Sequence, residues 1–157
     1  MSILYVDNLE PNLGSRVMAA GHVVQVVQFS GANTTSISTT QNTYVSAAGT
    51  CSITPTSSTS KILITHSAGG LAQTTQSTKI RIKRDGTEIW KDDRYGYNSG
   101  SDWVPNPWKL TYLDSPFATS QVDYTFEIAQ GSTGFLRHND LDTSSNTWIT
   151  ILMEIAQ

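Results

Sequence analysis

The segment from Lys91 to Trp108 combines the residue types that recognise sugars. It places tyrosine and tryptophan rings beside carboxylates, among glycines and prolines. A pyranose stacks its apolar face on an aromatic ring while its hydroxyls bond to acids and amides. The same rings also suit the small core of a long loop or a contact between subunits, so both interpretations stay open. The candidate glycan-contact residues are Asp93, Tyr95, Tyr97, Asp102 and Trp103.

A second cluster, in residues 138–142, carries nitrogen and oxygen atoms of the kind that hold cations. Its members are His138, Asp140 and Asp142. Carboxylates and imidazoles are common metal ligands. Their number and spacing match no regular ligand set, and Asn139-Asp140 is ordinary turn chemistry. We therefore expect a polar hairpin tip rather than a metal site.

The sequence lacks the motifs of the common catalytic centres. It contains no Walker loop, dinucleotide-binding glycine pattern, nucleophile elbow or His-Glu-x-x-His pair. Paired acids are also found in glycosidases, but no spacing anchors such a pair here. The single cysteine, Cys51, stands in a strand-like run and is predicted to be a small buried side chain. We expect no enzyme activity and no cofactor.

Charge and hydrophobicity exclude two classes of partner. The formal net charge is −3 and 15% of the residues are charged, so no basic field attracts nucleic acid or an anionic membrane. No apolar run approaches the roughly 20 residues that cross a bilayer, so no membrane insertion is expected. The first residues also lack the basic start and apolar segment of a signal peptide, so the protein is expected to stay where it is made.

Residues 1–20 are predicted to form an extended N-terminal arm. They show no strand period and contain turn-forming pairs such as Asp7-Asn8. The arm is nevertheless more apolar than a solvated tail, so we expect it to dock on its own domain, a sister subunit or a larger assembly. Its candidate anchoring residues are Ile3, Leu4, Tyr5, Val6, Leu9 and Leu13.

Residues 21–157 have the pattern of one all-β domain. Apolar and polar residues alternate in short runs such as Val122–Ile128, and turn signals recur at about 8–12-residue spacing. Asp85-Gly86 lies between two such runs, and both residues of a type I′ turn need positive φ, so a hairpin is predicted there. About nine or ten strands without a helical period predict an antiparallel β-sandwich or jelly-roll knob.

The first and last long strands are apolar on both faces. They are Val23–Phe29 and Trp148–Ile155. An antiparallel sandwich normally leaves one face of each sheet in water, so the second apolar face needs a cover. A symmetric partner subunit is the economical cover, and we expect a homo-oligomer, a trimer ahead of a dimer.

Six phrases between Gly21 and Gln157 form an ordered set. They are GHVVQVVQ from Gly21, SITP from Ser52, SKILI from Ser60, RDGTEI from Arg84, LDSP from Leu113 and ILMEIA from Ile151. In order and spacing they resemble the β modules of structural and tail-fibre proteins of tailed phages, especially cyanophages.

The resemblance implies a virion component with a jelly-roll-like fold and no catalytic residues. It would be made in the host cytoplasm and displayed on the phage particle, generally as a homotrimer. Together with the arm, it predicts a tail fibre or appendage that docks on other tail or capsid proteins and contacts a host cell-surface glycan. A capsid (head) decoration or cement protein is the first alternative, because a short arm suits that position too. A carbohydrate-binding module is the second.

Overall fold

The computed structural model describes residues 20–32, 41–74, 76–98, 104–131, 135–138 and 147–157. Within this part of the chain every regular element is a strand. The strands are β1 (Val23–Ala32), β2 (Val45–Ser46), β3 (Cys51–Ile53), β4 (Lys61–Thr74), β5 (Gln76–Arg84), β6 (Thr87–Asn98), β7 (Val104–Asp114), β8 (Val122–Gln130), β9 (Phe135–His138) and β10 (Thr147–Ile155). Apart from Ala20, the predicted arm and its anchoring residues lie outside the described residues.

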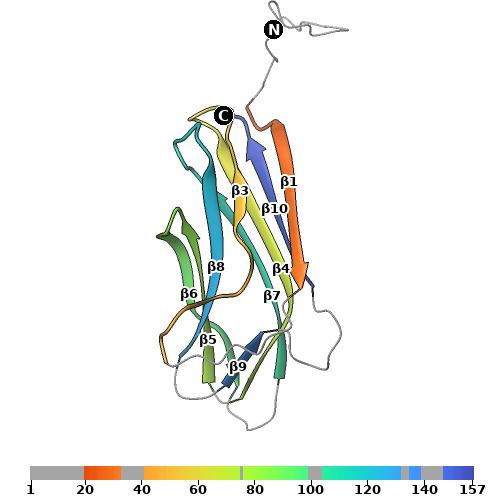
Figure 1. Ribbon diagram of the computed structural model, residues 1–157, viewed down its shortest axis with the longest axis vertical. Coiled ribbons are helices and arrows are strands. Elements are labelled where there is room, and N and C mark those ends of the chain that lie inside the picture. The colour runs from red at the N-terminus through yellow and green to blue at the C-terminus, as the bar shows by residue number, and fades with distance from the viewer. Residues whose placement is uncertain (1–19, 33–40, 75, 99–103, 132–134, 139–146) are drawn as a thin grey trace, which may run out of the picture.

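The strands form two antiparallel sheets that pack face to face (Figure 1). Sheet A has the order β1-β10-β4-β7, and β9 pairs with the far end of β4. Sheet B has the order β2-β8-β5-β6, and β3 also pairs with β8. Since β2 and β3 pair with successive parts of β8, they act as one interrupted strand.

This strand order is that of a jelly roll. With β2 and β3 counted as one strand and β9 set aside, the ten strands reduce to eight. Sheet A then holds the first, eighth, third and sixth strands, and sheet B the second, seventh, fourth and fifth. The pairs 1–8, 2–7, 3–6 and 4–5 arise when one long antiparallel hairpin rolls up into two sheets. The predicted all-β antiparallel sandwich is confirmed.

The predicted tight turn joins β5 to β6. Asp85 and Gly86 have φ of +49° and +80°, the positive values that a type I′ turn requires. The Asp85 amide donates to the carbonyl of Asp123 at 2.9 Å, and its carboxylate accepts from the Asp123 amide at 2.9 Å. The turn is therefore tied to β8 as well as closing its own hairpin.

The core lies between the inward faces of the two sheets. Alternation along β8 buries Val122, Tyr124, Phe126 and Ile128 and leaves the residues between them partly exposed, as predicted. The largest fully buried side chains are Trp108, Tyr124, Phe126, Ile62, Ile64, Ile80, Ile82, Ile128, Leu152 and His66.

The long loop expected between Lys91 and Trp108 is mostly strand, so that expectation was wrong. β6 continues to Asn98, and β7 begins at Val104. The extension of β6 has a ladder partner, since Asn98 pairs with Gln76 of β5. Pairing with a neighbouring strand outweighs the weak local strand propensity of these polar and glycine-containing residues.

Candidate interaction face

The outer face of sheet A carries a group of exposed and half-buried apolar side chains. Alternation along β10 buries Trp148 and Leu152 and turns its isoleucines and Met153 outward. In β1, Val27 and Phe29 pack against the core while Val26 is 57% exposed. The prediction of two apolar faces is confirmed for β10, whereas the exposed face of β1 carries Gln28 and Ser30 beside Val26. The outward apolar residues of β10 are Ile149, Ile151, Met153 and Ile155.

Four apolar side chains form a row across this face. The register places Met153 opposite both Val26 of β1 and Leu63 of β4. Leu63 in turn lies opposite Leu113 of β7, which is 49% exposed. Directly opposed residues of antiparallel strands share a face, so the row crosses all four strands. We call Val26, Met153, Leu63 and Leu113 the ridge.

A shallow, open hollow of about 340 Å³ lies beside the ridge. Short side chains create it, because Thr65 lies opposite Thr111 in the register, one outward position along β4 and β7 from the ridge. Its lining comes from β4, β7 and β10, and is formed mainly by Thr65, Ser67, Lys109, Thr111, Ile149 and Ile151. One face of sheet A therefore carries a raised apolar row next to a depression.

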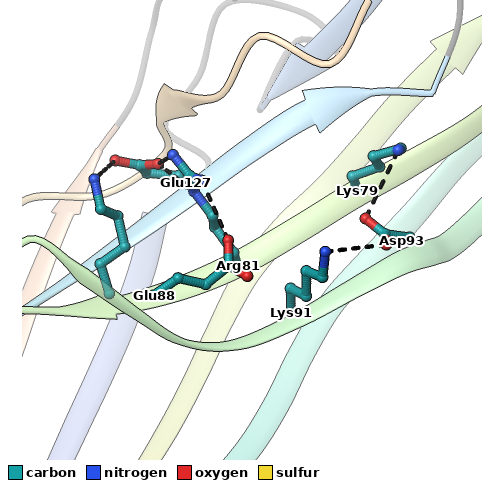
Figure 2. Close-up of polar contacts among 7 residues, drawn as sticks. Lys79, Arg81, Glu88, Lys91, Asp93 and Glu127 are labelled. Atoms are coloured by element: carbon teal, nitrogen blue, oxygen red, sulfur yellow. Dashed lines mark hydrogen bonds and ion pairs between the residues drawn. The ribbon is translucent and has the colours of Figure 1, made fainter.

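The outer face of sheet B is charged instead. Figure 2 shows Arg81 of β5 between Glu127 of β8 and Glu88 of β6. The Arg81 Nε atom donates to a Glu127 oxygen at 2.6 Å, and Lys83 Nζ lies 3.5 Å from the other oxygen. The Arg81 guanidinium also lies 3.8 Å from the centre of the Tyr44 ring. Exposed ion pairs contribute at most about 1 kcal/mol each, so this network indicates a face that is adapted to water.

Two of the five predicted glycan-contact residues have described side chains, and both have partners within the chain. Asp93 forms ion pairs with Lys79 at 3.7 Å and Lys91 at 3.5 Å (Figure 2). The Tyr95 ring packs against the core, and its hydroxyl accepts from the Lys109 amide at 2.7 Å and donates to the Lys109 carbonyl at 3.2 Å. The side chains of Tyr97, Asp102 and Trp103 lie outside the described residues, so the glycan contact stays a prediction.

A buried carboxylate joins the two sheets at the end of β7. Asp114 accepts hydrogen bonds from Arg84 Nη1 at 2.9 and 2.8 Å and from the Tyr124 hydroxyl at 2.7 Å. Burial, and then the neighbouring carboxylate, raise the pKa of Tyr124 far above its usual value, so the phenol stays a donor. Because Arg84 and Tyr124 belong to sheet B and Asp114 to sheet A, the cluster clamps the sandwich.

A second buried carboxylate, Glu154, stands where β10 meets β1. It accepts hydrogen bonds from Gln25 at 2.7 Å and from the amide and hydroxyl of Thr56, both at 2.8 Å. Burial by itself raises the pKa of Glu154, but the hydrogen bonds that the carboxylate accepts outweigh burial, so its pKa lies below the usual value. The ionised Glu154 carboxylate therefore has a structural role, because it holds the 54–60 turn region to β1 and β10.

Cys51 and His66 are both buried in the core. Cys51 is fully buried, as predicted, and burial raises the pKa of its thiol to about 11. The His66 ring stacks on Phe126 with centroids 4.4 Å apart, and its Nδ1 lies 2.8 Å from the Thr150 hydroxyl. A protonated, enclosed thiol is a poor nucleophile, so the arrangement suits packing.

Two kinds of site are absent from the described part of the chain. No three His, Cys, Asp or Glu side chains are grouped there as a metal ion would need. No helix there is long and apolar enough to cross a bilayer. Residues 139–142 lie outside the described residues, so the polar hairpin tip remains a prediction.

Sequence reasoning found part of this face and missed the rest. It identified the apolar residues of β1 and β10 but not Leu63 of β4 or Leu113 of β7. Neither β4 nor β7 is apolar throughout. Because side chains alternate along a strand, Leu63 lies on the same face as Thr65, and Leu113 lies on the same face as Thr111. The alignment of the two leucines with Met153 follows from the register, which the sequence pattern does not give.

Comparisons with known proteins give similarity of shape only. No family model matches the sequence, and no curated protein matches it. Among solved structures, the chain is similar to the infectious bursal disease virus VP2 subviral particle, with 14% identity, a TM-score of 0.47 and 98% of this chain covered. It is also similar to dimeric latent PorU from Porphyromonas gingivalis, with 8% identity, a TM-score of 0.39 and 94% covered. The chain spans 37% of the first of those chains and 14% of the second.

Proposed function

We propose that this protein is a structural component of a virus particle, namely a trimeric fibre or appendage of a tailed phage. In this proposal residues 1–20 attach it to another tail or capsid protein, and the jelly roll forms a knob on the particle surface. The phage assignment is supported by the ordered sequence phrases described above. The structural role is supported by the unequal outer faces of the two sheets.

The observation that carries the proposal is the apolar outer face of sheet A. A solvated sheet face normally carries polar side chains at alternate positions, as sheet B does with its ion pairs. Sheet A instead exposes Val26, Leu113 and Ile149, at 57%, 49% and 41%. Contiguous exposed apolar surface of this kind marks contact sites in soluble proteins. A self-associating building block therefore fits the molecule better than a solitary domain.

Glycan contact is part of the proposal, through the end of β6 and the connection that follows it. Asp93 and Tyr95 are already engaged within the chain, so Tyr97, Asp102 and Trp103 are the residues through which we expect a sugar to bind. Binding of the full chain to a glycan array tests this, with Trp103→Ala as the variant and Trp90→Ala, within β6, as a control. Binding lost only in Trp103→Ala supports the contact, and an inert array removes it.

The experiment that tests the whole proposal is localisation on the particle. Electron microscopy of phage particles carrying a tagged copy should place the protein at the tail as three-fold appendages. A chain lacking residues 1–20 should fold and still be absent from purified particles. Three-fold density on the head instead would identify a capsid decoration protein, and incorporation of the truncated chain would refute the anchoring role of the arm.

A further inference from the structure

We propose that copies of this chain contact one another through the outer face of sheet A, with the ridge of one copy seated in the hollow of the next. This inference rests on the self-association contained in the proposed function and names the surface responsible. The partner is a second copy of the same jelly roll.

The shape of the face supports a second copy as its occupant. The ridge and the hollow occupy adjacent rows, since Leu63 and Thr65 are successive outward residues of β4 and Leu113 and Thr111 are successive outward residues of β7. A raised apolar row and a depression of about 340 Å³ on one surface are complementary to the same two features on another copy. Such self-complementarity is what a symmetric assembly of identical subunits requires.

The size of the face is sufficient for a specific contact. It spans four strands spaced ~4.8 Å apart and about eight residues of ~3.4 Å rise, which gives roughly 500 Å² per copy. Two such faces meeting over their whole area would bury about 1,000 Å² together, the lower bound for a specific interface, and in a trimer each face divides this area between two neighbours. The ridge lies towards one end of this face and supplies apolar side chains, and Thr65 and Thr111 of the hollow supply hydroxyls beside them.

The charge of the face allows a second copy to be distinguished from an acidic partner by salt dependence. Lys61 and Lys109 are its charged groups among the described outward residues of sheet A, and no carboxylate there accompanies them. An acidic partner would bind by ion pairs that salt screens. Contact between two copies is apolar, and added salt reduces the repulsion between their lysines. Self-association is therefore expected to persist or strengthen at high salt.

The test uses the full chain and single charge insertions on the ridge. The variants are Val26→Lys and Leu113→Lys, whose parent side chains are already about half exposed, so the fold tolerates the new charge. Phe117→Lys is the matched control, because Phe117 is 79% exposed but belongs to the connection between β7 and β8 rather than to the outer face of sheet A. Thr111→Arg fills the hollow and tests the other half of the contact. Sedimentation velocity over a concentration series measures assembly, and circular dichroism checks folding.

The wild type is expected to be oligomeric, with Phe117→Lys equal to it. Each ridge variant and Thr111→Arg should raise the dissociation constant by about ten-fold or more. If the wild type assembles and the folded ridge and hollow variants assemble equally well, this face is not the contact, although self-association stands. A wild type that stays monomeric up to high micromolar concentration refutes self-association itself. Dissociation at high salt would identify an ion-paired contact and overturn the apolar one proposed.

Discussion

Replacing Asp114 with alanine should destabilise the sandwich more than any surface change. The carboxylate is 5% exposed and receives both Arg84 Nη1 hydrogen bonds and the Tyr124 hydroxyl. Asp114→Ala removes the acceptor and leaves a guanidinium and a phenol facing an apolar gap. The link between the end of β7 and sheet B is lost at the same time.

The magnitude follows from burial. Breaking a buried ion pair by removing one partner costs about 3–5 kcal/mol. The Arg84 side chain is 25% exposed, so water recovers part of that loss, and we expect about 3 kcal/mol. For a chain of this size that lowers Tm by roughly 6–12 °C. Glu88→Gln, on the wet face of sheet B, should change the free energy of unfolding by less than about 0.5 kcal/mol.

Urea unfolding at one fixed protein concentration, followed by tryptophan fluorescence, measures these values with the contribution of self-association held constant. Tyr124→Phe is made in the wild type and in Asp114→Ala to complete a double-mutant cycle. Tyr124→Phe should lower the free energy of unfolding of the wild type and should change that of Asp114→Ala much less. Additive losses, or an Asp114→Ala loss below about 1 kcal/mol, would show that water rather than these partners satisfies the carboxylate.

Three further predictions concern the core. Gly31→Ala places a methyl group 2.7 Å from the Trp148 ring, so it should cost about 1–3 kcal/mol in urea unfolding, whereas Gly49→Ala, at 3.3 Å, should cost less. The thiol of Cys51, with its pKa raised to about 11, should resist a thiol reagent at pH 8 in the folded protein and react at once in denaturant; fast native reaction would contradict its burial. Glu154 has a folded pKa below its ordinary value of 4.5, so its contribution to stability is present above that value and is lost as pH falls through the folded pKa. Unfolding free energies between pH 7 and 3 should therefore decline less steeply in Glu154→Gln than in the wild type.

The fold class could be predicted because strand signals are local. Alternation in Val122–Ile128 and the Asp85-Gly86 turn depend on a few neighbouring residues, and both are found where expected. The strand order could not be predicted, since β1 pairs with β10 across more than a hundred residues. Pattern also misjudged strand length in β4 and β6, where polar residues pair at the far end of the sandwich. Long-range pairing, rather than propensity, determines those ends.

The candidate face shows the same division between local and long-range information. The sequence shows apolar residues on both sides of the β1 and β10 segments. This pattern predicted that a partner covers the outer face of these strands. The ridge and the hollow are not visible in the sequence, because they arise only when four strands align in one register. A shift of one residue would turn each outward side chain into the core. The residue types therefore indicate that a contact exists, and the register determines its shape.

The jelly-roll topology also links the proposed anchor to the proposed contact. Residues 1–20 lead directly into β1, the edge strand that carries Val26, and the domain's first residues are held to the chain end by hydrogen bonds between Gly21 and Ala156 and between Ala156 and His22. Chains anchored at one site on a particle would therefore bring their sheet A faces together. Tethering raises the effective concentration of each face for its neighbours, to millimolar values for short linkers. On the particle, tethering would therefore reinforce a contact of about 1,000 Å² that we expect to hold copies together in solution as well.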